Sequence, residues 1–405
     1  MDLERFGASP VGNLVPLTGT DGRTGDPYSH FGFAPDPLGD LPPLSNTAWS
    51  TVARASHALG RLQQGAQLVP NPGLLRRPTL RREAQSTSAL EGTFAPLEEV
   101  LAADVIDDRS RSSALSEVLN YVRAAELAFD WISERDITVS LFGELQRTLV
   151  EGTTADTREA GRIRTIPVAI GSRSGSIYDA RFVPMPPGPT LEAGVRDLVD
   201  WIRNSAAQGR DPVVAAAMAH YQFETLHPFN DGNGRLGRLL IVLQLLLEQT
   251  LSEPLLSVSP WFEARRDAYQ EALAEVSATG SWDEWITFFA TGIEASAIDT
   301  AQRMAELLAI QASSQERIRQ SGVTGSIRDI ADLLVDTPYV TVSSIARTTG
   351  KTYQAAKNAL EKLVQLGILE EVEGPSVRVF RAPDVLRATT RPSESAQRHS
   401  GDRRS

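Results

Sequence analysis

The sequence predicts a mainly helical protein with a small amount of β structure. Residues 213–226 and 234–247 have the composition and the end signals of two consecutive helices. Residues 325–385 contain three short helical segments followed by two strand-like segments. With 405 residues, the chain is long enough for two or three domains with a large core. We expect a helical core that includes a β-hairpin, a helical N-terminal domain and a small C-terminal module.

The composition excludes several classes of protein. The chain contains no cysteine, which rules out disulfides, thiol nucleophiles and zinc–thiolate sites. The longest apolar run, Leu239 to Leu247, is too short to cross a bilayer, and no signal-peptide pattern opens the chain. We therefore expect a cytoplasmic protein without a membrane partner. A net charge of −11 argues against a protein that coats nucleic acid, although a local basic patch stays open.

The N-terminal part combines an irregular stretch with helices. Residues 1–38 are rich in glycine, proline and aspartate with little periodicity, so we expect a flexible arm. Residues 40–110 are expected to form a helical domain. Within it, a helical run leads to Gly92, which fits a helix stop and leaves Glu91 at a helix C-terminus, where an acid needs a cationic partner. Alternatively, Ser88 opens a capping box that would start a helix there.

Residues 115–310 are expected to form the helical core. Apolar alternation from Gly161 to Gly171, a turn rich in glycine and serine, and a short stretch from Arg181 to Pro184 predict a β-hairpin. Asp211-Pro212 is then a good helix start, with a capping side chain before a proline. Pro228 ends this helix, because the residue before a proline is displaced from the helical region. The next helix is apolar nearly all round, so we expect it to be buried.

The loop between these two helices has the features of an anion site. Gly232 and Gly234 allow the backbone to approach a ligand closely, and the amides at the start of the next helix point toward the loop. Arg235 and Arg238 follow on one face of that helix. Cations at a helix N-terminus oppose the macrodipole. Two locally unfavourable arginines therefore indicate that the loop holds phosphate.

Two further side chains suggest what happens at the phosphate. Asp231 offers a hard oxygen ligand for Mg²⁺, which would bridge phosphate oxygens. His227 can accept a proton from an attacking hydroxyl, because an imidazole ordinarily titrates near neutral pH. Together they suggest nucleotide chemistry at an α- or β-phosphate. Taken singly, each residue also has an interpretation without function, since an Asn-Asp-Gly sequence usually forms only a turn.

The same residues carry a resemblance to a known family. The segment from His227 to Arg238, HPFNDGNGRLGR, is similar to the core motif of Fic proteins, His-Pro-Phe-x-Asp-Gly-Asn-Gly-Arg-x-x-Arg, at every fixed position. The resemblance implies a Fic-fold helical core and a protein AMP transferase. Such an enzyme moves AMP from ATP to a Ser, Thr or Tyr hydroxyl of a target protein, or of itself, and releases pyrophosphate.

The resemblance also implies roles for single residues. His227 resembles the catalytic general base, and Asp231 resembles the Mg²⁺ ligand. Phe229 resembles the anchor of the loop. The implied ATP-binding residues are Asp231, Gly232, Asn233, Gly234, Arg235, Leu236, Gly237 and Arg238, together with Tyr269 in the adenosine pocket. Arg238 would face the γ-phosphate. Many members of the family have a Tyr-Tyr pair in the adenosine pocket, at the point where this chain has Tyr269-Gln270.

Two further segments resemble parts of the same family. Residues 87–92, TSALEG, resemble its inhibitory motif, Ser/Thr-x-x-x-Glu-Gly/Asn, in members with an N-terminal inhibitory helix. The implied inhibitory residues are Thr87, Glu91 and Gly92, and Glu91 would pair with Arg238 and withdraw it from the γ-phosphate. The predicted hairpin resembles the flap that holds the target segment by strand addition. The implied flap residues are Ile170, Gly171, Arg181, Phe182 and Val183.

Residues 325–385 are expected to form a winged helix-turn-helix module. The expected helices are Ile327–Leu334, Val342–Thr348 and Thr352–Leu366, and the expected strands are Ile368–Val372 and Val377–Arg381. Basic and polar side chains of the third helix could meet DNA, whereas the acidic residues Glu361, Glu370, Glu371 and Glu373 weaken that interpretation. A protein-docking or dimerising module is the alternative. Residues 388–405, rich in Ser, Arg and Thr, are expected to be disordered.

Several functions stay open on this basis. The leading hypothesis is a protein AMP transferase that uses ATP and Mg²⁺ and is autoinhibited by Glu91. The alternative is a DNA-binding regulator with a Fic-like, nucleotide-sensing core. A third reading keeps a Fic enzyme but changes the reaction to another transfer or to removal of AMP. The intact Asp231, Gly232 and Arg238 favour AMP transfer over that reading. Homodimerisation stays open, because members of this family often dimerise.

Overall fold

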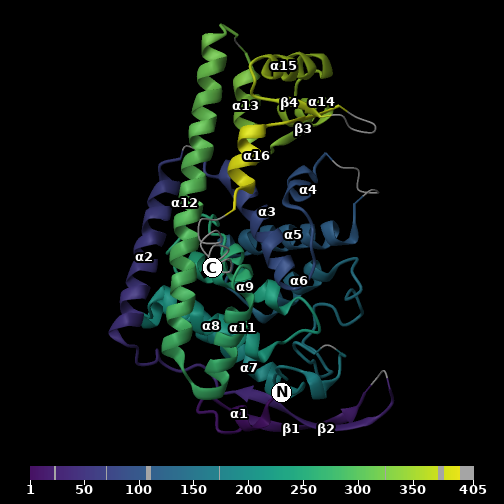
Figure 1. Ribbon diagram of the computed structural model, residues 1–405, viewed down its shortest axis with the longest axis vertical. Helices are drawn as coiled ribbons and strands as arrows, with labels where there is room; N and C mark the ends of the chain where they lie inside the picture. Colours follow the sequence, from purple (N-terminus) through teal and green to yellow (C-terminus); the bar gives the residue numbers. More distant parts are fainter. Residues whose placement is uncertain are drawn as a thin grey trace, which may run out of the picture. The chain divides into compact units, whose positions relative to one another are not determined.

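The computed structural model describes residues 1–21, 24–69, 71–105, 111–172, 174–323, 325–372 and 378–392, which are mainly helical (Figure 1). They form two compact units. Unit 1 contains Met1–Gly60, Arg123–Ser252 and Phe262–Glu294, and unit 2 contains Arg61–Val122, Glu253–Trp261 and Ala295–Ser405. The boundaries expected near residues 110 and 310 differ from these. The reason is that three long helices, α2 (Asn46–Gln67), α5 (Ser113–Glu134) and α12 (Trp282–Gln320), each belong in part to both units.

The remaining elements of unit 1 are mostly helices. They are α1 (Leu3–Gly7), α6 (Val139–Val150), α7 (Pro189–Arg203), α8 (Pro212–Leu226), α9 (Asn233–Leu247) and α11 (Arg266–Thr279), with the 3-10 turns η2 (Ile177–Asp179) and η3 (Ala206–Gln208). The short α10 (Ser259–Glu263) precedes α11. Apolar side chains of α6, α8 and α9 build the core, where Phe142 and Phe223 pack edge to face with ring centroids 5.5 Å apart.

The N-terminus is folded, so the flexible arm expected over residues 1–38 is wrong. After α1, strands β1 (Gly12–Thr20) and β2 (Pro27–Pro35) pair antiparallel in a long two-stranded ribbon (Figure 1). Phe6, Phe33 and Phe182 pack against one another with ring centroids 5.5 to 6.0 Å apart. This packing joins residues far apart in sequence, and composition and periodicity do not reveal it.

The helix pair predicted around the loop is confirmed as α8 and α9. The Asp211 carboxylate accepts the first-turn N–H groups of Val213 and Val214 at 3.0 and 3.1 Å. α9 is buried on nearly all sides, as its composition predicts. A Cβ at Gly237 would lie 2.4 Å from Oε1 of Glu224, so a glycine lets α9 pass close to α8. No helix in the described part of the chain has the length and apolar character needed to cross a bilayer.

The hairpin expected between Gly161 and Pro184 is present only in part. Ile170 and Phe182 form a single antiparallel bridge, and no regular strand extends from it within residues 161–172 and 174–184. In the register of this bridge the next hydrogen-bonded pair would include residue 184, and Pro184 has no N–H to donate. We call residues 161–172 and 174–185 the flap. Residue 173, within the predicted turn, lies outside the described residues.

Unit 2 contains the helices α3 (Gly73–Leu90), α4 (Leu97–Ala102), α13 (Ile327–Asp336), α14 (Val342–Thr349), α15 (Tyr353–Gln365) and α16 (Pro383–Thr390). Strands β3 (Tyr339–Thr341), β4 (Glu370–Val372) and β5 (Val379–Arg381) form a sheet in the order β3-β5-β4. The helices predicted over residues 325–385 are present, and both predicted strands appear in shorter form. The sequence does not predict β3. Glu373 and Val377 lie outside the described residues.

Helix α16 lies close to the end of the described chain. The disordered tail expected from residue 388 overlaps the last turn of α16, so this expectation is wrong for residues 388–390. The C-cap N–H of Arg391 donates to the Arg387 carbonyl at 3.1 Å, which closes the last turn of α16. The rest of the expected tail, residues 393–405, lies outside the described residues.

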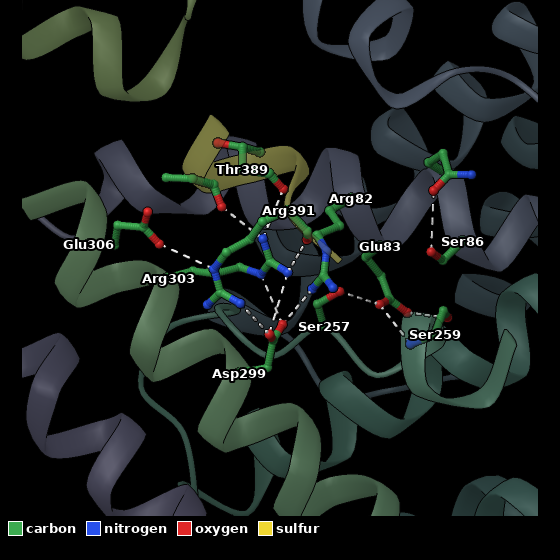
Figure 2. A network of polar contacts seen from close by, with 12 residues as sticks. Arg82, Glu83, Ser86, Ser257, Ser259, Asp299, Arg303, Glu306, Thr389 and Arg391 are labelled. Atoms are coloured by element: carbon green, nitrogen blue, oxygen red, sulfur yellow. Dashed lines mark hydrogen bonds and ion pairs between the residues drawn. The ribbon is translucent and has the colours of Figure 1, made fainter. Parts of the chain in front are cut away.

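A buried polar network connects α3, α12 and α16 within unit 2 (Figure 2). Oδ2 of Asp299 accepts hydrogen bonds from Nη1 of Arg82 and Nε of Arg303, both at 2.9 Å. Its Oδ1 lies 3.4 Å from Nη1 of Arg391. Arg303 also donates to carbonyls at the end of α16, at 2.8 and 3.1 Å. One carboxylate thus contacts three guanidinium groups, and Glu306 adds a second acid beside Arg391 at 3.2 Å.

Candidate active site

His227 closes α8 in an unusual backbone conformation. It is the C-cap residue, with φ 48° and ψ 62°, in the left-handed region that residues other than glycine rarely adopt. Its N–H donates to the Phe223 carbonyl at 2.9 Å, and its Nδ1 lies 3.2 Å from the Glu224 carbonyl oxygen. Because a carbonyl can only accept, Nδ1 carries the proton and Nε2 is the basic nitrogen. Such strain, about 1 kcal/mol or more, is typical of functional sites.

Asn233 holds the loop between α8 and α9 in shape. Its side-chain nitrogen donates to the Phe229 carbonyl at 2.7 Å, and its side-chain oxygen accepts the Phe229 N–H at 2.8 Å. Both residues are buried, as the anchor of a loop requires. The side chain of Asn233 is therefore engaged with the loop itself. A contact with a nucleotide would come from its backbone N–H.

The charged residues that the sequence predicts for the site lie at the start of α9 and in the loop just before it. Gly232 is the N-cap with φ 81°, and the amides of the first helical turn face the loop. Arg235 and Arg238 are each 2% exposed. Nη2 of Arg235 pairs with Oδ1 of Asp231 at 2.9 Å, and this carboxylate is half exposed. The predicted base, carboxylate and arginines thus come from one helix–loop–helix segment.

Other residues of the implied ATP site face the protein interior. Leu236 is fully buried, and Tyr269 is 4% exposed. The Tyr269 hydroxyl lies 2.7 Å from Nε2 of His220, whose Nδ1 lies 2.9 Å from the Gly237 carbonyl oxygen. That carbonyl can only accept, so Nδ1 donates to it and Nε2 accepts from the tyrosine. Burial lowers the pKa of His220 to about 3 and keeps the imidazole neutral. Tyr269 is thereby engaged in connecting α11 to α9.

Two buried side chains that the sequence reasoning missed hold the loop to its surroundings. Gln146 of α6 donates to the Asp231 carbonyl at 3.1 Å and accepts the Gly161 N–H at 2.5 Å. Arg164 donates from Nε to the His227 carbonyl at 2.8 Å. The sequence offers two weak signals for them. One is a glutamine among the buried apolar residues of α6, and the other is a single arginine within the apolar alternation of the flap.

The residues predicted for the flap contact different neighbours. Gly171 turns the chain with φ 68°. Nη1 of Arg181 donates to Oε1 of Gln270 at 3.0 Å, so the residue that departs from the Tyr-Tyr pattern of the family holds the flap. Val183 is fully buried, and its carbonyl accepts the Phe33 N–H of β2 at 2.8 Å. One side of the flap is therefore covered by the N-terminal ribbon.

The predicted inhibitory segment forms the end of α3 in unit 2. Leu90 is the last helical residue, Glu91 is the C-cap, and Gly92 has φ 92°, a left-handed value that stops a helix. The N–H of the following residue returns to the Ser88 carbonyl at 3.0 Å. The helix-stop interpretation is confirmed, and a helix start at Ser88 is wrong. Thr87 is fully buried, whereas Glu91 is exposed.

Two regions of the chain match family models. Residues 49–130 match the Fic/DOC family N-terminal model, and residues 136–245, which include the loop, match the Fic/DOC family model. Protein adenylyltransferase fic-1 of Caenorhabditis elegans is 32% identical over 215 residues, which cover 52% of this chain and 38% of that protein. The protein of the same name in Caenorhabditis briggsae is 30% identical over 213 residues, with the same coverage. The matches thus span less than half the length of these relatives.

A solved structure extends the similarity of fold beyond these regions. The crystal structure of a Fic family protein from Desulfovibrio desulfuricans G20 matches with a TM-score of 0.55 and 22% sequence identity. The match covers 85% of this chain and 98% of that chain. At this identity the similarity concerns the fold alone.

Proposed function

We propose that this chain, which belongs to the Fic/DOC family over residues 49–130 and 136–245, is a protein AMP transferase. It moves AMP from ATP to a Ser, Thr or Tyr hydroxyl of a target protein, or of itself, and releases pyrophosphate. One observation carries the proposal: the loop after α8 combines a histidine whose Nε2 is basic with a carboxylate and two buried arginines at a helix N-terminus.

The proposed step is a displacement at the α-phosphorus of ATP. Nε2 of His227 takes the proton of the target hydroxyl, whose oxygen forms a bond to the α-phosphorus. The bond from that phosphorus to the bridging oxygen breaks, and pyrophosphate leaves with the electron pair. Arg235, Arg238 and the first amides of α9 balance the phosphate charge. The protein then contributes positioning and charge neutralisation rather than covalent chemistry.

Asp231 fits the role of a protein ligand for Mg²⁺. Its carboxylate is 49% exposed, and one of its oxygens is 2.9 Å from Arg235. The described residues contain no group of three or more His, Asp or Glu side chains that could hold a metal by themselves. An ion at Asp231 would therefore take its other ligands from phosphate oxygens and water, which is how Mg²⁺ commonly binds beside nucleotides. When bound, it supplies charge neutralisation at the phosphates.

Transfer of AMP predicts that label from ATP follows the α-phosphate and depends on His227. With Mg²⁺ and α-labelled ATP, the Glu91→Gly chain should label itself or a lysate protein, and γ-labelled ATP should give no label. Adding His227→Ala should reduce the rate about 100-fold or more, the usual contribution of a general base. The control is His57→Ala in the same background, because His57 is an exposed residue of α2. Absence of α-label, or a rate indifferent to His227, contradicts the proposal.

The alternative function, DNA binding by residues 325–385, has its support at the start of α15. Tyr353 is 59% exposed there, and Lys351 beside it is exposed as well. Such a helix end can enter a major groove. The basic surface is limited, however, because Arg378 pairs with Glu371 at 2.6 Å.

DNA binding predicts a salt-sensitive complex. A mobility shift with duplex from upstream of the chain's own gene should weaken as salt rises, with a slope of about 0.9 in logarithmic units for each phosphate contact. Lys351→Glu should weaken the shift, whereas Glu98→Gln, a change of an exposed acid in α4, should not. No shift at low salt, or a shift indifferent to Lys351, removes this alternative.

A further inference from the structure

Arg164 is a buried cation that binds backbone carbonyls. Its side chain is 2% exposed, and burial lowers the pKa of the guanidinium to about 10, which leaves it charged at neutral pH. In the described part of the chain, every hydrogen bond of this side chain goes to a backbone carbonyl rather than to a carboxylate. A charge that is buried without an acid is costly unless several dipoles compensate it. Four carbonyls do so here.

Two of these carbonyls belong to the end of α8. Nε donates to the His227 carbonyl at 2.8 Å, and Nη2 donates to the Leu226 carbonyl at 3.3 Å. The backbone N–H of Arg164 adds a bond to the Pro228 carbonyl at 2.9 Å. Arg164 thus binds three consecutive carbonyls around the strained residue. It also places a cation at the negative end of a helix, where the last carbonyls otherwise lack partners.

The other two carbonyls belong to the two limbs of the flap. Nη1 donates to the Ile166 carbonyl at 3.2 Å, on the limb that leads to the bridge between Ile170 and Phe182. Nη2 also donates to the Met185 carbonyl, on the limb that returns from the bridge. One planar guanidinium therefore connects both limbs of the flap to the backbone of His227. A lysine has a single donor atom and cannot reach four carbonyls with the same fork geometry.

We propose that Arg164 is a positioning residue that fixes the distance between His227 and the flap. This inference rests on the proposed function, in which the flap holds the target segment and His227 takes the proton of its hydroxyl. The flap sets where the hydroxyl lies, and the backbone of residue 227 sets where Nε2 lies. Arg164 connects the two through 2.8 and 3.2 Å bonds and does not itself touch the reacting atoms. Its loss should affect the chemical step more than the binding of ATP.

The test compares Arg164→Lys with Arg210→Lys in the Glu91→Gly background. Arg210 is a matched control, because it donates to the Trp201 carbonyl at 3.2 Å within the same unit but away from the loop. We expect Arg164→Lys to lower kcat for AMP incorporation about 100-fold, the cost of misplacing reacting groups by about 1 Å. The KM for ATP should stay within about threefold of the parent value, because the substitution should not weaken the binding of ATP. Arg210→Lys should leave both values unchanged. Rates are expressed per ATP-binding site, so that misfolded protein does not count.

A second measurement keeps the inference testable without catalysis. Hydrogen exchange of peptides from the flap and from residues 226–229 should quicken in Arg164→Lys, while exchange in β1 and α9 stays as in the parent. If the Glu91→Gly parent transfers no AMP, the proposed function fails and exchange alone decides the positioning role. Full kcat in Arg164→Lys from an active parent, or unchanged exchange at residues 226–229, overturns the inference.

Discussion

Replacing Glu91 by glycine is expected to raise AMP incorporation about 5- to 150-fold over the unaltered chain, the range of a coupling free energy of about 1–3 kcal/mol. Glu91 is an exposed acid at the C-cap of α3, where the helix dipole disfavours it and a cation is the natural partner. We propose that this partner is Arg238, which the pairing withdraws from the γ-phosphate. Glycine removes the acid and suits a helix end. The measurement is the initial rate with α-labelled ATP and Mg²⁺.

Two controls separate this mechanism from a general loosening of the chain. Glu91→Gln removes the charge without added backbone freedom and should raise the rate as well. Glu98→Gly makes the same chemical change at an exposed acid of α4 in the same unit and should leave the rate unchanged. Equal rates in the Glu98 and Glu91 variants, or no rise with either change at Glu91, would contradict autoinhibition by this residue.

The largest effect on stability is expected at Asp299. Asp299→Asn removes the charge that the guanidinium groups of Arg82, Arg303 and Arg391 share, and the first two of these side chains are 9% and 8% exposed. Breaking a buried ion network by removing one partner costs about 3–5 kcal/mol, because the remaining charges stay buried. We expect a loss of this size in the free energy of unfolding, measured by urea unfolding at neutral pH. The neighbouring Glu83 network shares α3 (Figure 2) but does not contain this carboxylate.

The control and the pH dependence sharpen this prediction. Glu306→Gln removes a 41%-exposed acid that binds Arg391 at 3.2 Å and should cost at most about 1 kcal/mol. Burial by itself raises the pKa of Asp299, but the charge of Arg82 and the bond from Arg303 outweigh it, so the net pKa lies below 3.8. A depressed folded pKa contributes stability above the unfolded pKa and loses it as the pH falls through the folded value. The cost of Asp299→Asn should therefore be constant from about pH 7 to pH 5 and shrink only in stronger acid. A cost equal to that of Glu306→Gln would contradict the prediction.

Helix ends were predictable because their signals are local. Asp211 caps amides two and three residues ahead, and Pro228 restricts the residue just before it. Gly92 stops α3 through its own φ of 92°. Each of these effects acts within a few residues, so the sequence alone contains the information. The charged residues of the loop were predictable for the same reason, since they follow one another along one short segment.

The contacts that hold the site were not predictable, because they depend on tertiary approach. Arg164 binds a carbonyl 63 residues away, and Gln146 binds one 85 residues away. Their partners are backbone carbonyls, which every residue has, so the type of the partner residue does not indicate the contact. The N-terminal ribbon is similar, since Phe33 gains its burial from contacts with the flap. The flap shows the opposite failure, because apolar alternation predicted a regular pairing of strands, whereas Pro184 lacks the N–H that the next pair would need.

The two hydrogen bonds between the Asn233 side chain and Phe229 also affect the chemical stability of the chain. Asn233 precedes Gly234, and an Asn-Gly pair deamidates readily, since an unhindered glycine lets the next backbone nitrogen attack the side-chain amide. In the folded chain, both ends of that amide are bonded to Phe229 and its backbone is helical, so the cyclisation is opposed. Deamidation would leave a carboxylate that cannot donate to the Phe229 carbonyl. The fold therefore protects the amide of residue 233 from deamidation.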